Sequence, residues 1–127
     1  MKGLAEFIDE GYSFQQKYEI ANGRKGPLDS LTKEERYNYI LEFSRHMVEE
    51  IFEAQKHVPR RAWRKKEEGY LDSNELRNEF IEEMFDVLLF YRSVLTFAGI
   101  SGEEFLKVAE EKLNYNSNRE DHRDKNG

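Results

Sequence analysis

Glutamate and aspartate residues recur at helical spacing in two stretches of the sequence. The first stretch reads E-E-x-x-E and ends at Glu53, and the second reads E-x-x-E-E-x-x-D and ends at Asp86. Residues three or four positions apart share one face of an α-helix, which pairs Glu50 with Glu53 and Glu83 with Asp86. Like charges at this spacing destabilise a helix by about 0.2–0.5 kcal/mol per pair. Two such stripes on facing helices would repel each other further, so the pattern needs an explanation.

A divalent cation would remove this repulsion. Mg²⁺ prefers carboxylate oxygens, and paired carboxylates together with substrate phosphates form a typical Mg²⁺ site. The alternative is an acidic helix face that is simply solvated. The acidic residues alternate with apolar ones such as Phe52 and Phe85, which places the carboxylates at the border of the apolar stripe. Because a buried carboxylate must be paired or bound to a metal, a metal site is as compatible with the pattern as a solvated acidic face, and both stay open at this point.

Basic residues gather in two places that suit phosphate binding. One is the segment around Trp63, which contains Arg60, Arg61, Arg64, Lys65 and Lys66. The other is K-L-N-Y-N-S-N-R near the C-terminus, where Lys112, Asn116 and Arg119 share a helix face. Arginine and lysine bind phosphates, and asparagine can donate to a sugar or phosphate oxygen. A solvated loop, and a lysine that complements a helix dipole, are the alternatives.

Composition narrows the class of protein. The chain has 127 residues and a formal net charge of −6, which indicates one domain and argues against a nucleic-acid-binding protein. Cysteine is absent, which excludes a disulfide framework and a thiolate metal site. No apolar run is long enough for a membrane span, and early acidic residues argue against a signal peptide. We expect a cytoplasmic protein that does not associate with membranes.

Apolar spacing and capping residues predict four helices that position these groups. The first runs from about Leu4 to Ala21 and ends at Asn22-Gly23. The second starts after Thr32, which forms a capping box with Glu35, and runs towards Val58. The third starts after Asp72 or Ser73 and runs to Gly99. The fourth follows Ser101, which forms a capping box with Glu104, and passes into a polar tail from about residue 117.

Four helices with short connections predict an all-α fold, an antiparallel four-helix bundle formed by a single domain over residues 1–127. The third helix is apolar on nearly all sides between Val87 and Leu95. A helix of this kind needs partners on several faces. We therefore expect oligomerisation to complete the bundle, as a homodimer or a homotetramer.

The order of the three motifs, E-E-x-x-E, E-x-x-D and K-x-x-x-N-x-x-R, resembles the all-α nucleoside triphosphate pyrophosphohydrolase superfamily. This superfamily includes the MazG proteins and the dimeric dUTPases, and the similar stretch runs from about Met47 to Arg119. The basic segment around Trp63 is similar to a Trp-containing loop of dimeric dUTPases and phage dCTPases. The N-terminal F-Q-Q-K is similar to the glutamine-bearing first helix of dimeric dUTPases.

The resemblance implies a role for each motif. It implies Mg²⁺, or Mn²⁺, bound by Glu50, Glu53, Glu83 and Asp86. Glu49 or Glu53 would act as the catalytic base, and Glu49 and Glu82 are further candidate ligands. The resemblance implies that the nucleoside triphosphate is contacted by Lys112, Asn116, Arg119, Trp63 and Lys65. Gln15 or Gln16 would read the base, although both are equally compatible with surface positions.

The implied reaction is hydrolysis of a nucleoside triphosphate, dUTP or dCTP, to the monophosphate and pyrophosphate. The chain departs from the family pattern in two places: no Gly-Tyr pair follows Arg119, and Arg61 stands where a lysine usually precedes the Trp. The base therefore stays open between these two nucleotides. A broad enzyme for noncanonical nucleotides is one alternative, and a non-enzymatic helical interaction module is another.

Overall fold

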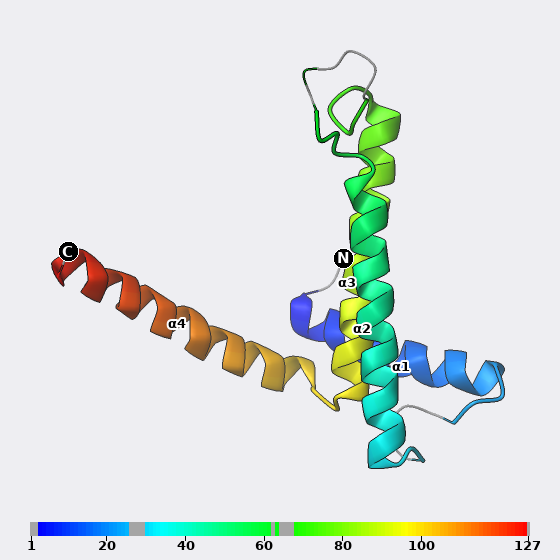
Figure 1. The fold of residues 1–127 in the computed structure, drawn as a ribbon. Helices are drawn as coiled ribbons and strands as arrows, with labels where there is room; N and C mark the ends of the chain where they lie inside the picture. Colours follow the sequence, from blue (N-terminus) through cyan, green and yellow to red (C-terminus); the bar gives the residue numbers. More distant parts are fainter. Residues whose placement is uncertain (1–2, 26–29, 62, 64–67, 127) are drawn as a thin grey trace.

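The computed structural model describes residues 3–25, 30–61, 63 and 68–126, although the side chains of residues 120–126 are not described. The described residues form helices and no strands, which confirms the all-α class. The four helices, shown in Figure 1, are α1 (Leu4–Ala21), α2 (Lys33–Gln55), α3 (Asn74–Phe97) and α4 (Gly102–Asn126).

The helices begin where the capping residues predict. The Thr32 hydroxyl accepts from the backbone N–H of Glu35, and the Glu35 carboxylate accepts from the backbone N–H of Thr32, which completes the capping box of α2. The Ser73 hydroxyl caps α3 by accepting from Leu76 N–H. The Ser101 hydroxyl accepts from Glu104 N–H at the start of α4. Each cap satisfies a backbone donor that the first helical turn leaves without a partner.

Two glycines end helices in the left-handed conformation. Gly23 has φ +73° and follows α1, and Gly99 has φ +75° and follows α3. At Gly23 the chain forms a Schellman motif, in which Arg24 N–H donates to Glu19 C=O and Gly23 N–H donates to Ile20 C=O. The motif turns Arg24 back towards α1. Helix α2 ends at Gln55, slightly before the expected end near Val58. The backbone N–H groups of the next residues donate to carbonyl oxygens three positions earlier, and not four as in an α-helix.

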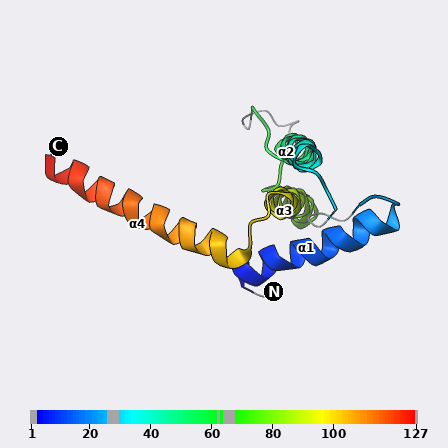
Figure 2. The ribbon, with the colours of Figure 1, turned by 90° about the horizontal axis from the view of Figure 1, so that it is seen from below.

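Helices α2 and α3 lie side by side and run in opposite directions (Figure 1). Helix α1 crosses this pair and packs on α3 (Figure 2). The core lies at this crossing, where Phe97 is fully buried and stacks on Tyr39 and Phe43 of α2 at ring-centroid distances of 4.6 and 5.3 Å. Phe7 and Ile8 of α1 are also buried there. The core therefore joins α1, α2 and α3.

Helix α4 is anchored at its first turn and then extends away from the other helices (Figures 1 and 2). Its first residue, Gly102, donates its N–H to the Asp9 carboxylate of α1 at 2.8 Å. A Cβ on Gly102 would lie 2.2 Å from the backbone oxygen of Ala5, so glycine permits this close approach. Phe105 meets Tyr91 of α3 edge to face. Beyond these first turns, α4 extends away from α1, α2 and α3 (Figures 1 and 2).

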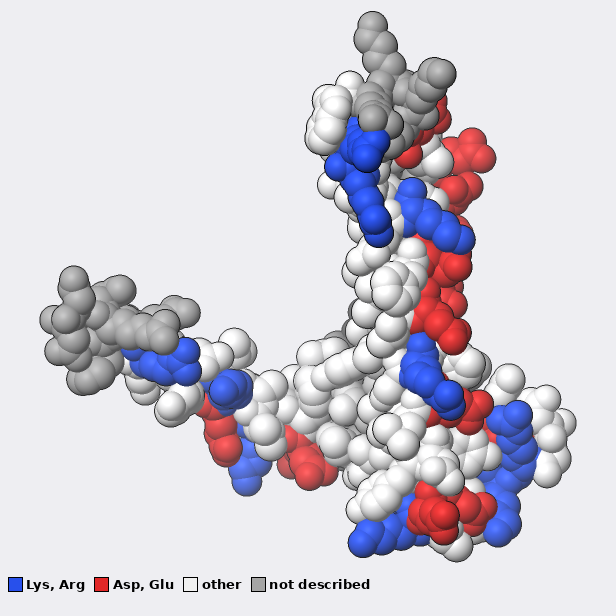
Figure 3. All heavy atoms as spheres, in the orientation of Figure 1, with Lys and Arg blue, Asp and Glu red and all other residues white. Residues whose placement is uncertain are grey.

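The chain leaves much apolar surface exposed along the helices. Exposed apolar side chains lie on α2 (Val48, Phe52), α3 (Ile81, Met84, Phe85, Leu88) and α4 (Val108, Leu113). Figure 3 shows a strip without charge beside the acidic edge of the α2–α3 pair. The antiparallel pair agrees with the expected bundle, whereas its closure by four helices and by further subunits remains a prediction.

No single described helix is long and apolar enough to cross a membrane, and α3 with α4 meets the length and composition criteria only as a pair bent by 106°.

Candidate metal centre and adjoining pocket

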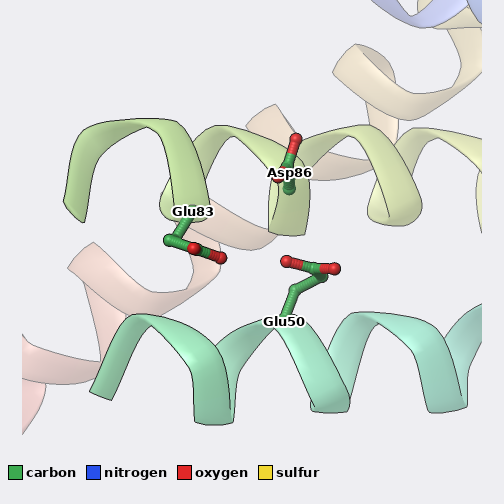
Figure 4. Close-up of side chains that lie close together, drawn as sticks. All are labelled: Glu50, Glu83 and Asp86. Atoms are coloured by element: carbon green, nitrogen blue, oxygen red, sulfur yellow. The ribbon is translucent and has the colours of Figure 1, made fainter. Parts of the chain in front are cut away.

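Three of the predicted carboxylates converge between α2 and α3. Glu50 extends from α2 towards α3, where Glu83 and Asp86 lie one turn apart (Figure 4). One ligand oxygen from each residue lies within 4.8 Å of the others, and all three residues are half-buried. The helical spacing of three aligns the two acids on α3, and the antiparallel pairing of α2 places Glu50 opposite them. These residues form what we call the carboxylate cluster.

The cluster concentrates negative charge. Burial raises the pKa of Glu50, and the negative charge of Asp86 and the neighbouring Glu83 raise it further. Burial and the neighbouring acids therefore both disfavour the ionised form of Glu50. A divalent cation between them would reverse this effect, because hard cations bind carboxylate oxygens at short distances.

The other two acids of the first motif, Glu49 and Glu53, are not part of the cluster and pair with other side chains. Glu53 is exposed, and its carboxylate accepts a hydrogen bond of 2.8 Å from the Lys56 ammonium. Glu53 is nevertheless close enough to contribute to the raised pKa of Glu50. The Glu49 carboxylate lies 3.4 Å from His46 Nδ1 and is mostly exposed. The structure thus brings three of the four predicted ligands together and places Glu53 beside them in an ion pair.

A pocket of about 620 Å³ adjoins the cluster and is bounded by all three core helices. Glu50 and Asp86 belong both to the cluster and to the wall of this pocket. Its aromatic walls come from Phe14, Tyr18, Phe43 and Phe90. Its polar groups include Gln15, Arg24, Glu42, His46, Arg92 and Ser93. The volume lies within the range of small-molecule sites, and apolar walls with a few polar groups are typical of them.

The two candidate glutamines occupy different environments. Gln15 lines the pocket and is 2% exposed, so it occupies an interior position and not a surface one. Gln16 is half-buried and does not line this pocket, and its Oε1 atom is buried without a hydrogen-bond partner in the part of the chain that the structure describes. Gln15 is therefore the better placed of the two to contact a ligand beside the cluster.

The three predicted phosphate-binding residues of α4 lie away from the cluster in the described part of the chain. Lys112, Asn116 and Arg119 lie on the part of α4 that extends away from α2 and α3 (Figure 1). Trp63 is 78% exposed. Lys65 lies outside the described residues. One basic residue that the sequence motifs did not identify is Lys56, whose pKa is raised by its hydrogen bond to Glu53 and by the nearby Glu53 and Glu83 charges.

Sequence reasoning also missed the groups that build the pocket wall. Phe14, Phe43 and Phe90 come from three helices, and each one alone looks like a core residue. Glu19 is fully buried and hydrogen-bonded to Gln15. The spacing of four between these two residues places them on one face of α1, and this spacing could have identified the pair from the sequence. His46, which belongs to none of the sequence motifs, lines the pocket and lies 3.8 Å from Glu42 and 3.4 Å from Glu49.

A scan against protein-family models found no match, and searches of curated proteins and of solved structures also found none.

Proposed function

We propose that the chain is a Mg²⁺-dependent nucleoside triphosphate pyrophosphohydrolase. The observation that carries the proposal is the shared wall: Glu50 and Asp86 belong to the carboxylate cluster and also line an aromatic pocket large enough for a small planar ligand. A nucleotide joins a planar base to a chain of phosphates. A site that binds a base beside a cation-binding cluster suits such a ligand.

The donor set of the cluster fits a magnesium ion. Glu50, Glu83 and Asp86 would hold it through carboxylate oxygens, with space for Glu53 if its ion pair with Lys56 opens. When bound, Mg²⁺ or Mn²⁺ supplies Lewis-acid activation of water and neutralises phosphate charge. The raised pKa of Glu50 supports the fit, because burial and the neighbouring acids make its ionised form unfavourable without a cation.

The chain's own residues then have distinct roles. Glu49 or Glu53 accepts a proton from the attacking water; both carboxylates are exposed, and Glu53 is close enough to Glu50 to affect its pKa. The water oxygen forms a bond to phosphorus, the bridging P–O bond between the α and β phosphates breaks, and the products are a nucleoside monophosphate and pyrophosphate. His46 lies close enough to Glu49 to orient that carboxylate.

The pocket provides the base site in this proposal. Aromatic walls stack on a planar ring, and Gln15 offers an amide to its edge. We infer a pyrimidine deoxynucleotide, dUTP or dCTP, as the substrate. Such an enzyme acts on free nucleotides in the cytoplasm and needs neither nucleic acid nor a membrane.

A second copy of the chain completes the site in this proposal. Lys112 and Arg119 would neutralise charge on the phosphates, yet they lie on the extended part of α4. The exposed apolar side chains of α2, α3 and α4 favour assembly, because burying one large apolar side chain contributes about 1.5–3 kcal/mol. A homodimer or homotetramer in which α4 of one subunit covers α2 and α3 of another would complete both the bundle and the site.

The test is a pyrophosphate-release assay on canonical and modified nucleoside triphosphates, with Mg²⁺ and with EDTA. We expect release that needs Mg²⁺, that is fastest with dUTP or dCTP, and that falls at least 100-fold in Glu50→Gln. The control is Glu34→Gln, the same change at an exposed position in the first turn of α2. Absence of release on every nucleotide by the folded wild type would disprove the proposal.

The same exposed apolar surface favours one second candidate, a non-enzymatic module that binds another helical protein. In that case Glu50, Glu83 and Asp86 would each be dispensable, and Mg²⁺ would not change the melting temperature. Equal rates on many noncanonical nucleotides would instead indicate a broad housekeeping pyrophosphohydrolase.

A further inference from the structure

A fully buried carboxylate lies directly behind the pocket. Glu19 is 0% exposed and follows Gln15 by one helical turn on α1. Neither the carboxylate cluster nor the proposed reaction uses this residue. Burying a carboxylate is costly unless hydrogen bonds replace its water, so the position of Glu19 calls for a physical explanation.

The groups around Glu19 that the structure pairs with it are hydrogen-bond donors. Gln15 Nε2 donates to Glu19 Oε1 at 2.8 Å, and the Tyr39 hydroxyl donates to Glu19 Oε2 at 3.4 Å. The Arg24 guanidinium lies 3.7 Å from Oε2, held there by the Schellman motif at the end of α1. Glu19 therefore acts as an acceptor towards three segments of the chain.

This arrangement fixes the orientation of the Gln15 amide. A glutamine amide can rotate by half a turn and exchange its oxygen and nitrogen. At Gln15 the exchange would place an oxygen against the Glu19 carboxylate, and that contact opposes it. The Ser93 hydroxyl is compatible with either orientation, because it lies 3.2 Å from both Gln15 Oε1 and the Leu89 carbonyl oxygen and can also accept a hydrogen bond. Glu19 is therefore the contact that sets the orientation of the amide. The second N–H of Gln15 meets no acceptor among the described residues, so it is available to a ligand in the pocket.

We propose that Glu19 is a positioning residue that locks the Gln15 amide so that it donates a hydrogen bond into the pocket. The pocket then selects a planar ring that presents a carbonyl oxygen over one that presents an amino group at the same place. This inference rests on the proposed function for the identification of the ligand as a nucleotide. Applied to pyrimidines, it assigns the preference to the 4-oxo ring of uracil over the 4-amino ring of cytosine.

A merely structural role for Glu19 would have a different signature. Glu19 also connects α1 to Tyr39 of α2, and loss of that connection would lower stability and weaken every ligand equally. Selectivity between two rings of the same shape depends on the amide orientation and not on the stability of the fold. The ratio of two affinities therefore separates the two roles.

The experiment measures binding of deoxyuridine and deoxycytidine by NMR titration, so it requires no catalysis. We expect the wild type to bind deoxyuridine about tenfold more tightly than deoxycytidine. The Gln15 N–H would form a hydrogen bond with the carbonyl oxygen of uracil, whereas it would face the amino group of cytosine, which is also a donor. Glu19→Gln has nearly the same shape but can itself donate, which allows the Gln15 amide to rotate. Its preference should fall to within about twofold.

Two further variants keep the test decisive. Tyr39→Phe removes another partner of Glu19 but leaves the Gln15 contact, so its melting temperature should fall while the preference stays. If Glu19→Gln does not fold, Glu19→Asp, which draws the carboxylate back from Gln15, should show the same loss of preference.

Three outcomes would overturn the inference: a wild type that binds neither nucleoside, a wild type without preference, or a Glu19→Gln variant that keeps it. Failure of the proposed function would appear separately, as nucleoside binding without release of pyrophosphate from any triphosphate.

Discussion

Glu50 is the residue of the carboxylate cluster whose pKa is raised. It faces Glu83 and Asp86, and burial together with these charges raises its pKa. A carboxyl group whose pKa is higher in the folded state than in the unfolded state binds protons more tightly when folded. Its contribution to stability is therefore fully present below the unfolded pKa, and it is lost as the pH rises through the folded pKa.

The first prediction follows for the protein without metal. In EDTA, Glu50→Gln should melt a few degrees above the wild type at about pH 8, because the variant lacks the repelling charge. The difference should disappear at about pH 3, well below the usual pKa of glutamate, where Glu50 is protonated in both states. Thermal melts across this pH range measure it, with Glu34→Gln as the exposed control. A variant that melts below the wild type at high pH would contradict the expected repulsion.

A second prediction concerns the cation itself. Mg²⁺ should raise the melting temperature of the wild type in a saturable way, since a ligand that binds the folded state at 100 times its Kd contributes about 2.7 kcal/mol. The effect should weaken strongly in Asp86→Asn, which removes one carboxylate of the cluster. EDTA should restore the original melting temperature. Equal stabilisation of wild type and variant would place the cation elsewhere.

At the scale of the helices, the docking of α4 depends on one close approach. Gly102 lies against the backbone of Ala5, and a Cβ at Gly102 would come within 2.2–2.7 Å of three Ala5 backbone atoms. Backbone atoms cannot move aside as a flexible side chain can. The first turn of α4 therefore requires glycine at this position.

The third prediction is that Gly102→Ala lowers the free energy of unfolding by about 1–3 kcal/mol, the usual cost of overpacking. The Asp9 hydrogen bond to the N–H of residue 102 should weaken with it. Chemical denaturation measures the loss. Gly3→Ala is the matched control, because a Cβ at Gly3 meets no atom within 4 Å. Equal stability of the two variants would mean that α4 is not docked against α1 as described.

Helix boundaries were predictable from sequence because they depend on local chemistry. Thr32 with Glu35, Ser73, and the glycine at position 23 each act on backbone groups within one turn. The alignment of Glu83 with Asp86 follows from helical geometry alone. These features need no knowledge of how the helices pack.

The pocket was not predictable in this way. Gln15, Phe43 and Phe90 lie on three different helices, and only the crossing of α1 over the α2–α3 pair brings them together. The sequence also predicted Lys112 and Arg119 as part of the site, but it gives no crossing angle for α4. Tertiary packing decides whether these residues reach the cluster from their own chain or from another.

At the scale of the whole molecule, the direction of α4 separates the two halves of the proposed site. The acids lie between α2 and α3, whereas Arg119 lies far along α4 (Figure 1). If a second subunit supplies Arg119, every complete site combines acids from one chain with Lys112 and Arg119 of α4 from another. Two variants that are inactive for different reasons should then complement each other when their subunits mix.

The fourth prediction tests this sharing directly. Glu50→Gln removes an acid, Arg119→Ala removes the phosphate contact, and each alone should be nearly inactive. After unfolding and refolding together in equal amounts, half of the dimers should contain one chain of each kind. One site in each such dimer combines intact acids with an intact α4, so activity should recover to roughly a quarter of the wild type.

Lys33→Ala serves as the control partner, because this exposed residue lies at the start of α2 and takes no part in the site. Sedimentation of the wild type should show a dimer or a tetramer, as the exposed apolar faces favour. Recovery requires that the two defects lie on different chains of one site. If the mixture of Glu50→Gln and Arg119→Ala stays inactive while mixtures with Lys33→Ala refold normally, α4 serves its own chain, and it must bend back onto α2 and α3 to do so.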